Sequence, residues 1–276
     1  MDRADLHVHT RASDGDLSPE EIVGLAGKRE LLAVAITDHD TITGALQALQ
    51  TGKKLNVNVI PGIEISAVYD PGTLHMLGYF KEFPVGLEDD LEKIQKGRLD
   101  RFPRIIERLN SIGLDITIED VRHIAGDAQI GRPHIAKALI KKAYVKDFDE
   151  AFDKYLGKGK PAYVEKEKLT WEEAIGLIKR HKGISVLAHP FTLELESSEL
   201  KKLITRMKAA GLSGMEVYYP EHTHEQTKLY KAIAIEAGLI LTGGTDFHTP
   251  ERGASLGDCG IGEEGLRIIL KHLDYH

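Results

Sequence analysis

Metal-ligating side chains recur in this sequence beside short apolar runs. The first case is Ala4–Gly15, which reads ADLHVHTRASDG. Side chains on a strand alternate between its two faces, so His7 and His9 point the same way and form half of a site for a divalent metal ion. A buried, hydrogen-bonded histidine pair accounts for the same spacing, so this motif by itself leaves both interpretations open.

Five later segments repeat the arrangement of a polar donor beside an apolar run. The donors and their runs are His39 after Leu31–Ile36, Glu64 after Asn56–Ile60, His75 at the start of Leu74–Phe80, His189 at the end of Ile184–Ala188, and Asp246 with His248 after Leu239–Thr242. Active sites of α/β barrels lie at the face where the carboxyl ends of the strands meet. Because buried charges need partners, we expect these side chains to converge on a metal cluster at that face.

The remaining pattern favours a parallel α/β sheet or barrel with an insertion. Another apolar run at Gly214–Tyr218, and helix starts at Ser18 and Thr170 that each have a glutamate three residues later, continue the alternation of strands and helices. Residues 82–160 interrupt this alternation, because they look helix-rich and end in the turn-rich stretch Gly157–Pro161. We therefore expect a barrel domain from residues 1–81 and 161–276, and an inserted helical subdomain from residues 82–160.

Composition indicates the expected cellular location and the class of binding partner. The net charge of −7 over 276 residues argues against a polycation that binds long nucleic acid. Cys259 is the single cysteine, so we expect no intrachain disulfide and a cytoplasmic location. We also expect neither a secretory signal nor a membrane span, because no apolar segment of the required kind is visible.

The donor types indicate which metals the cluster would hold. Mixed histidine and carboxylate ligands suit Mn, Zn or Fe, whereas Mg and Ca prefer oxygen ligands alone. Nine candidate donors exceed the needs of one ion, so two or three divalent ions are expected. Closely spaced ions lower the pKa of a water molecule and clamp a phosphoryl group during in-line attack. The sequence therefore predicts metal-dependent hydrolysis of a phosphate ester.

The segments ADLHVHTRASDG, AITDHDTITG, PGIEIS, LAHP and TGGTDFH together resemble the PHP (polymerase and histidinol phosphatase) family, in order along the chain. The resemblance covers residues 1–80 and 162–276. It implies a distorted (β/α)7 TIM-like barrel with a trinuclear metal site.

The resemblance also implies how the donors divide among three ions. One ion would be held by His7, His9, Glu64 and Asp246, a second by Asp14, His39 and His248, and a third by Glu64, His75 and His189, with Glu64 as the bridge. The oxygen donor Asp14, where some relatives have histidine, suggests a harder metal such as Mn. Asp38 and Asp40 either support His39 or cap the following helix, and the sequence leaves both roles open.

The position of the insertion resembles one branch of the family, whose members act on nucleoside 3′,5′-bisphosphates or trim short RNA from the 5′ end. Gly131–His134 (GRPH) resembles a signature of that branch, and so does the stretch Tyr218–His222. We expect Arg132 to bind a second phosphate, since guanidinium pairs with phosphate oxygens through two hydrogen bonds. His134 is expected to assist Arg132 or to donate a proton to the leaving oxygen, and Asp246 to accept one from the nucleophile.

Further cations and aromatic residues are candidates for substrate contact. Arg101, Arg104 and Arg108 form a helical stripe that is either solvated or lines the cleft, and Arg98 lies nearer the apolar face. The other candidates are Lys158, Lys160, His222, Tyr218 and Tyr219, whereas His224 is expected to be solvated. With 6% aromatic residues, a nucleotide or short oligonucleotide is favoured over long single-stranded nucleic acid.

Three other functions remain in competition with this one. A histidinol-phosphate-type phosphatase would need no site for a second phosphate. A non-catalytic metal module that stabilises a partner would show no turnover, although all nine expected ligands are present here. An amidohydrolase-type C–N hydrolase would use a bridging lysine, and none is placed for that role. The sequence leaves the oligomeric state open.

Overall fold

The structure, a computed structural model, describes residues 3–126, 130–164, 169–251 and 253–274, with the side chains of residues 92–100 outside the description. Among the described residues, eight strands form one sheet, and seven of them follow the order β1-β2-β3-β4-β6-β7-β8 around the barrel. Their bounds are Ala4–Val8 (β1), Ala33–Ile36 (β2), Val59–Val68 (β3), Leu74–Tyr79 (β4), Ile184–Leu187 (β6), Gly214–Tyr218 (β7) and Ile240–Gly243 (β8). A parallel bridge between Val8 and Phe247 brings the two ends together, so the sheet is a nearly closed barrel. The expected distorted seven-stranded barrel is confirmed.

One strand departs from the expected parallel order. β4 is antiparallel to both β3 and β6, because only a short turn joins β3 to β4 and a parallel pair needs a long crossover. The amino end of β4 therefore lies at the same rim as the carboxyl ends of the parallel strands. His75 reaches that rim from the start of its strand for this reason.

The third strand is longer than the sequence pattern predicts. The expected run Asn56–Ile60 continues in the structure to Val68, through the segment PGIEISAV. Glu64 consequently lies inside β3 and not after it. The short strand β5 (Leu169–Thr170) pairs with the outer end of β3.

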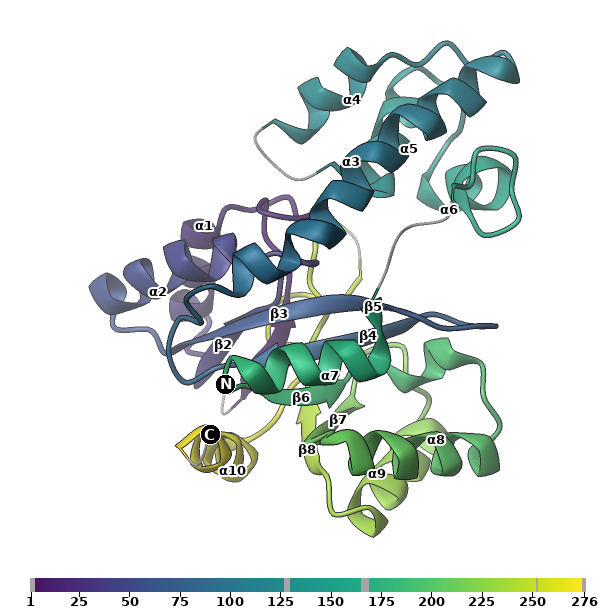
Figure 1. Cartoon of the computed structure of the whole chain (residues 1–276). Helices are drawn as coiled ribbons and strands as arrows, with labels where there is room; N and C mark the ends of the chain where they lie inside the picture. Colours follow the sequence, from purple (N-terminus) through teal and green to yellow (C-terminus); the bar gives the residue numbers. More distant parts are fainter. Residues whose placement is uncertain (1–2, 127–129, 165–168, 252, 275–276) are drawn as a thin grey trace.

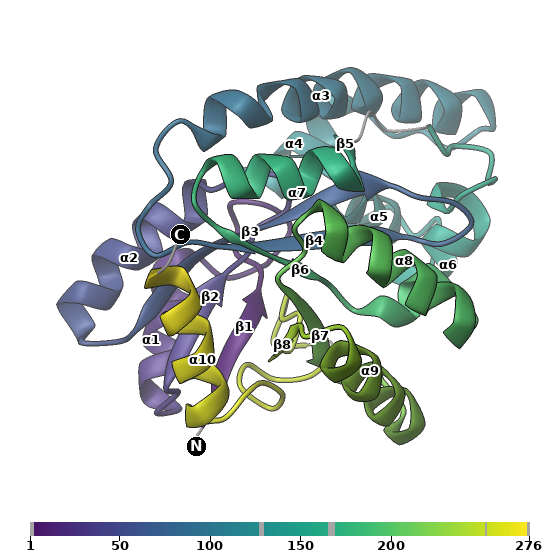
Figure 2. The ribbon, with the colours of Figure 1, turned by 60° about the horizontal axis from the view of Figure 1, so that its bottom comes forward.

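Helices cover the outside of the barrel (Figures 1 and 2). They are α1 (Pro19–Lys28), α2 (Thr43–Leu55), α7 (Trp171–Arg180), α8 (Ser197–Ala210), α9 (His224–Glu236) and α10 (Glu263–Asp274), with a short 3₁₀ turn, η2 (Pro190–Leu193). The expected capping boxes at Ser18 and Thr170 start α1 and α7. In a separate hydrophobic cluster, α10 packs Leu266, Ile269 and Leu273 against strands of the barrel.

Residues between β4 and β5 form a group of helices above the barrel in Figure 1: α3 (Leu87–Ser111), α4 (Ile118–Ala125), α5 (Arg132–Lys141), α6 (Phe148–Ala151) and a π-helical turn, η1 (Phe152–Leu156). Helix α3 belongs to two cores: Leu87 and Leu91 pack with the barrel, whereas Phe102 and Leu109 pack in a hydrophobic cluster of the inserted helices. The same helix thus ties the inserted helices to the barrel. Among the described residues, no helix combines the length and apolarity that crossing a membrane requires.

Candidate functional site

The nine expected ligands come together at one rim of the barrel. His7 and Glu64 lie on β1 and β3, and His75 opens β4; the others follow strand ends, namely His9 and Asp14 after β1, His39 after β2, His189 after β6, and Asp246 and His248 after β8. His7, His9 and Glu64 are fully or almost fully buried. Strand ends that meet at one face therefore gather donors from the whole length of the barrel sequence.

Glu64 lies at the centre of this cluster. Its Oε2 atom is 3.1–3.2 Å from ring nitrogens of three histidines, and its Oε1 atom is 2.8 and 3.1 Å from those of two others. The first three are His7, His9 and His39, and the other two are His75 and His189. A carboxylate whose two oxygens face different sets of imidazoles has the position required of a bridging ligand.

Asp246 completes the inner group. Its Oδ1 atom lies 3.3 Å from His7 Nε2 and 3.0 Å from His9 Nε2. Its Oδ2 atom accepts a hydrogen bond of 3.0 Å from the Tyr219 hydroxyl. The residue has a φ of 52°, which is uncommon for a residue with a side chain. Its carboxylate faces His7 and His9, at and just after the end of β1.

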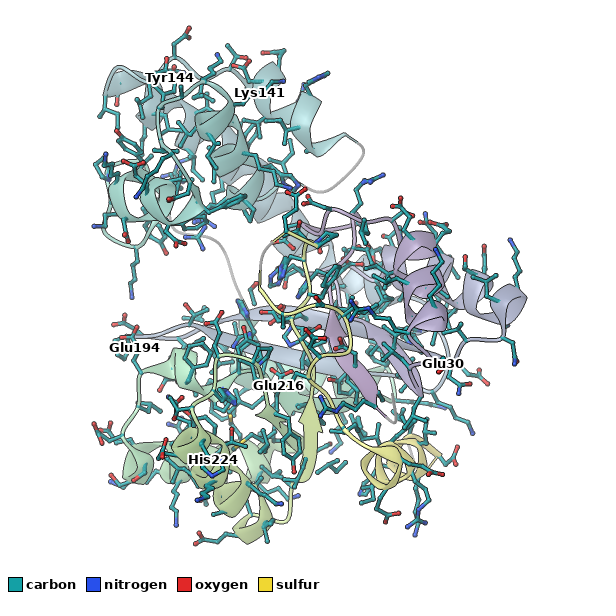
Figure 3. The ribbon with its side chains drawn as sticks, turned by 180° about the vertical axis from the view of Figure 1, so that it is seen from behind. Glu30, Lys141, Tyr144, Glu194, Glu216 and His224 are labelled. Atoms are coloured by element: carbon teal, nitrogen blue, oxygen red, sulfur yellow. The ribbon has the colours of Figure 1, made fainter. Side chains whose placement is uncertain are left out.

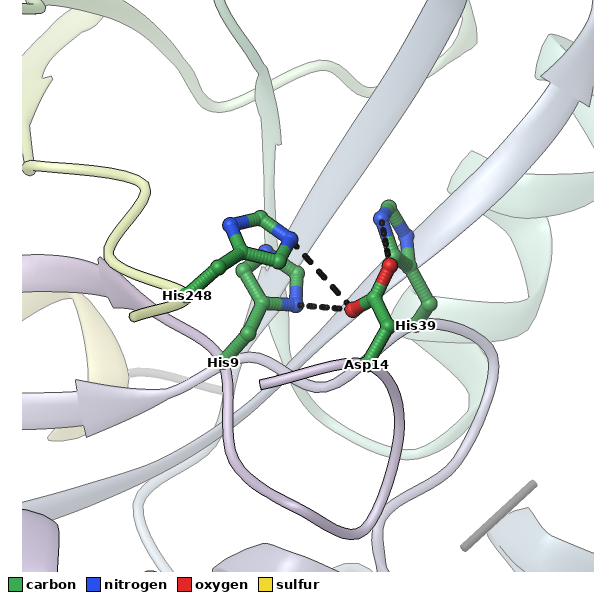
Figure 4. Close-up of side chains that lie close together, drawn as sticks. All are labelled: His9, Asp14, His39 and His248. Carbon is green, nitrogen blue, oxygen red and sulfur yellow. Dashed lines mark ion pairs between the residues drawn. The ribbon is translucent and has the colours of Figure 1, made fainter. Parts of the chain in front are cut away.

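Asp14 gathers a second group of donors from its loop (Figure 4). Its carboxylate oxygens lie 3.7 Å from His9 Nδ1, 3.3 Å from His248 Nε2 and 4.0 Å from His39 Nε2. The loop from Thr10 to Asp14 thus returns to the strand end that precedes it. The spacing of these atoms leaves room for a cation between them.

Three sets of donor atoms are close enough to surround a metal ion: His7, His9, Glu64 and Asp246; His9, Asp14, His39 and His248; and His39, Glu64 and His75. The first set is the one expected from the sequence. The second adds His9 to the expected group, and the third contains His39 in the place expected for His189. His189 still reaches the bridging residue, at 3.1 Å from Glu64 Oε1.

The chemistry of the donor atoms fits metal ions. His7 Nε2, both ring nitrogens of His9, Glu64 Oε2 and Asp246 Oδ1 are buried and form no hydrogen bond of acceptable geometry. Buried polar atoms normally have such partners, because desolvation without them costs free energy. Cations held in the separate donor sets would supply these atoms with partners, with the two ring nitrogens of His9 facing different sets.

The electrostatics of the cluster favour positive charge. Burial by itself would lower the pKa of His9, but the carboxylates of Asp246 and Glu64 raise it to about 10. Burial would raise the pKa of Glu64, yet the imidazoles of His39, His75 and His7 hold it well below its usual range. His39 differs, because burial lowers its pKa to about 3 and leaves a neutral imidazole with a lone pair for a metal.

Glu216, which no sequence motif indicated, contacts two residues of the cluster, His7 and His189. It is fully buried on β7, its Oε1 atom lies 3.0 Å from His7 Nδ1, and its Oε2 atom accepts the His189 backbone N–H at 2.8 Å. Figure 3 shows it among the strands at the centre of the barrel. A lone carboxylate inside the apolar run GMEVY was the available signal. Its contact orients His7 so that Nε2 faces the cluster.

Asp38 and Asp40 hold backbone segments and do not cap α2. Asp38 accepts the Thr10 N–H at 2.7 Å and the Ser13 hydroxyl at 2.7 Å, which shapes the loop that carries Asp14. Asp40 accepts the Ser66 N–H at 2.8 Å. The capping alternative is wrong, because α2 has no side-chain cap at its start.

A cavity of about 460 Å³, which we call the basic cavity, lies between the cluster and the inserted helices. Asp14, His39 and His75 line one side, and Arg101, Arg132 and Lys158 supply positive charge elsewhere on its wall. Arg132 also lies over the rings of Phe152 and Tyr163, at 5.4 and 5.8 Å, and donates to the Leu156 carbonyl at 3.1 Å. These contacts hold the guanidinium at the cavity wall.

Other expected substrate contacts lie elsewhere. Lys160 does not line the basic cavity, whereas its neighbour Lys158 does. His134 is buried, and its Nδ1 atom accepts the Gly131 N–H at 3.0 Å at the start of α5. His222 is also buried and bonds through Nδ1 to the Val217 carbonyl at 2.9 Å.

The arginine stripe of α3 is divided between cavity and solvent. The side chain of Arg98, the arginine expected to point inward, lies outside the described residues, and Arg101 is the one that lines the basic cavity. Arg104 and Arg108 are exposed. Of the two tyrosines, Tyr219 lies beside the cluster, where its hydroxyl donates a hydrogen bond to Asp246. Tyr218 is partly buried and packs against hydrophobic residues.

Comparison with known proteins agrees with this geometry. The chain is 32% identical over 255 residues to the 3′,5′-nucleoside bisphosphate phosphatase of Chromobacterium violaceum, covering 92% of this chain and 90% of the relative. It is 33% identical over 267 residues to a 5′-3′ exoribonuclease of Haemophilus influenzae, covering 96% and 94%. A solved structure from Bifidobacterium adolescentis, described as a metal-dependent phosphoesterase, superposes with a TM-score of 0.88 at 30% identity, covering 98% of this chain and 96% of the other.

These relatives confirm the expected fold and activity class, a metal-dependent hydrolase of phosphate esters with histidine and carboxylate clusters that could bind metal. The model of the PHP domain matches residues 5–198, more than half of the sequence. The chain therefore belongs to the PHP domain family.

Proposed function

We propose that this chain removes the 3′-phosphate of nucleoside 3′,5′-bisphosphates. The observation that carries the proposal is the basic cavity directly beside the donor cluster. A phosphate ester with a single phosphate needs the cluster alone, whereas a second phosphate needs cations at a short distance from it. The relative from Chromobacterium violaceum is a 3′,5′-nucleoside bisphosphate phosphatase, and its substrate has this pair of phosphates.

The cluster would hold two or three divalent ions of the Mn, Zn or Fe type. The nine ligand roles expected from the sequence are part of this proposal, and the convergence of the donors on Glu64 supports them. When bound, the ions would lower the pKa of a water molecule and offset the charge of the phosphate oxygens. The mixture of imidazole and carboxylate donors favours these metals over Mg or Ca.

Side chains near the cluster would orient the substrate so that its phosphorus atom faces the attacking water. Arg132 and Arg101, on the far wall of the basic cavity, would bind the 5′-phosphate and place the ribose so that its 3′-phosphate meets the cluster. Asp246 would accept a proton from the attacking water, with its other oxygen fixed by the Tyr219 hydroxyl. His134, at the start of α5, does not line the cavity, so we propose that its role is to position Arg132.

We infer that residues 82–160 act as an inserted unit that covers the substrate. A hydrophobic cluster that starts at Phe102 and extends past this boundary to Val164 packs separately from the barrel core, and its helices carry Arg101 and Arg132 into the cavity. An additional contact joins the unit to the rim, where Lys137 donates to the Asp16 carboxylate.

The proposal is tested with an Arg132→Ala variant on two substrates. The value of kcat/KM for a nucleoside 3′,5′-bisphosphate should fall about 10–100-fold, as expected when a charge-assisted hydrogen bond is lost. The value for the corresponding nucleoside 3′-monophosphate should change little. Arg132→Lys, which keeps the charge but not the planar fork, should retain part of the activity.

Arg122→Ala is the matched control, because Arg122 is exposed on α4 and does not line the cavity. An equal loss on both substrates in Arg132→Ala, or a wild-type enzyme that hydrolyses the monophosphate as well as the bisphosphate, contradicts the proposal. The second result would favour a histidinol-phosphate-type phosphatase, which has no second phosphate to bind.

A further inference from the structure

The imidazole of His189 is held by a single hydroxyl group on the far side from Glu64. His189 lies directly before the 3₁₀ turn η2, which contains Thr192. The Thr192 Oγ1 atom lies 3.1 Å from His189 Nδ1, 2.8 Å from the Thr73 carbonyl oxygen and 3.0 Å from the His189 carbonyl oxygen. One hydroxyl thus contacts the imidazole ring and two carbonyl groups.

The directions of these hydrogen bonds follow from the number of protons available. A hydroxyl has one proton to donate and two lone pairs with which to accept, whereas a carbonyl oxygen only accepts. When the Thr192 proton goes to a carbonyl oxygen, the bond to His189 forms only if Nδ1 carries a proton and donates it to Oγ1. The arrangement therefore favours His189 with a proton on Nδ1, because both groups then have a partner.

The other ring nitrogen of His189 faces the donor cluster. Nε2 lies 3.1 Å from Glu64 Oε1, and the same oxygen lies 2.8 Å from His75 Nδ1. Both His189 and Glu64 are buried. A neutral imidazole with its proton on Nδ1 has its lone pair on Nε2, so it presents that lone pair to a cation beside Glu64 Oε1.

The turn between β3 and β4 keeps Thr192 in place. The Thr73 N–H donates to the Thr192 carbonyl at 2.8 Å, which returns the bond that Thr73 accepts from the hydroxyl. Gly72 approaches the same backbone so closely that an added Cβ atom would lie 2.3 Å from the Thr192 carbonyl oxygen. The hydroxyl therefore has a fixed position from which to orient the His189 ring.

We propose that Thr192 is a positioning residue, which holds a proton on His189 Nδ1 and presents Nε2 to a metal ion beside Glu64 Oε1. The inference rests on the proposed function, in which His189 is one of the nine metal ligands. Partners on the outer nitrogen of a ligating imidazole fix both its tautomer and its orientation.

A comparison with His7 predicts which ion depends on Thr192. His7 Nδ1 contacts the Glu216 carboxylate at 3.0 Å, whereas His189 Nδ1 contacts an uncharged hydroxyl. A carboxylate partner makes an imidazole more basic, and thus a stronger metal ligand, than a hydroxyl partner does. The ion held through His189 should therefore be released more readily than the ion held through His7.

The test titrates Mn²⁺ or Zn²⁺ into the metal-free protein by calorimetry, with elemental analysis of the dialysed protein. Thr192→Val keeps the shape of the side chain and removes the hydroxyl, so it should weaken the weakest binding step about 10–100-fold and leave the tighter binding unchanged. Thr192→Ser, which keeps the hydroxyl, should restore that step. Thr205→Val is the control, because the Thr205 hydroxyl only donates to the Lys201 carbonyl on exposed α8.

A second measurement follows the proton itself. In the zinc-loaded protein, ¹⁵N spectra of the histidine rings should show His189 with a proton on Nδ1. That proton should exchange with water faster in Thr192→Val than in the wild type or in Thr192→Ser, because its acceptor is missing. A merely structural role of Thr192 would leave this exchange unchanged.

A third variant reaches Thr192 from its neighbour without touching a donor. Gly72→Ala would push the new methyl group against the Thr192 backbone, so it should weaken the same binding step. Gly24→Ala is the control, since an added Cβ atom there meets no described atom within 4 Å. Thermal unfolding of each variant shows whether the fold is kept.

The outcomes separate this inference from the proposed function. Unchanged metal affinity in Thr192→Val, or a loss that Thr192→Ser fails to restore, would overturn the inference. The loss of kcat/KM in Thr192→Val should be equal for a nucleoside 3′,5′-bisphosphate and the 3′-monophosphate, since the hydroxyl acts on the cluster and not on the second phosphate. A wild-type protein that binds the metal but leaves the bisphosphate intact refutes the proposed function, and the metal titrations still decide the role of Thr192.

Discussion

The donor cluster and the basic cavity lie side by side but are built in different ways. Cluster residues such as His7 and Glu64 are buried on or directly after strands, where the sheet fixes their backbone. The cations of the basic cavity sit on α3, α5 and a turn, and depend on a second hydrophobic core for their position. We therefore propose that the barrel provides the chemistry and that the inserted helices provide the choice of substrate. If the division holds, changes in the cluster should affect every phosphate ester, changes at the cavity should affect bisphosphates alone, and changes inside the inserted helices should affect mainly stability.

The first prediction removes a donor from the cluster. His7→Ala should abolish turnover of every phosphate ester and reduce the metal content per chain, because His7 contacts both Glu64 and Asp246. Turnover assays and elemental analysis provide the measurement. His224→Ala serves as the control, since His224 lies exposed at the start of α9 (Figure 3). Full turnover in His7→Ala would show that the cluster is not the reaction centre.

The second prediction concerns Glu216, which lies beneath the cluster. Glu216→Gln should keep the shape of the site but weaken metal binding about 10–100-fold, because the charge that orients His7 is lost. Titration of the metal-free protein measures the affinity, and Glu20→Gln on the exposed face of α1 is the control. Unchanged affinity would limit Glu216 to a packing role.

The third prediction separates two arginines on one helix. Arg101→Gln should lower kcat/KM for a bisphosphate by about tenfold, because Arg101 lines the basic cavity, whereas exposed Arg104→Gln should have little effect. Nucleoside 3′-monophosphate hydrolysis should be unaffected in both variants. Similar losses in both would mean that a diffuse positive field, and not a built cavity, selects the substrate.

The fourth prediction is a small effect on stability in the inserted helices. Burial lowers the pKa of His134 below its ordinary value of 6.5. As pH falls below 6.5, the unfolded chain takes up a proton that the folded residue resists, so the free energy of unfolding decreases. His134→Gln keeps an acceptor for the Gly131 N–H and should lose less stability between pH 7.5 and 5.5. Denaturant unfolding of the wild type and of His134→Gln at pH 7.5 and pH 5.5 measures this difference. An identical pH dependence in the two proteins would contradict the prediction.

The sequence predicted the cluster more fully than the cavity. His7 and His9 share a face because strand geometry is local, and the other donors stand beside apolar runs whose ends must meet in a barrel. The capping boxes at Ser18 and Thr170 were predictable for the same reason, since a few neighbouring residues decide them. Arg132 was identified through its motif and does line the basic cavity.

The sequence alone determined that His7 and His9 share one face of a strand and that helices start after Ser18 and Thr170, since spacing within a strand or a helix turn fixes direction. Only the tertiary structure decided that β4 runs antiparallel, that Glu216 lies beneath His7, and that Lys158 lines the basic cavity and Lys160 does not. Those outcomes depend on distances between elements far apart in the chain. Such distances follow from how the barrel and the inserted helices pack, and no local pattern of residues encodes them.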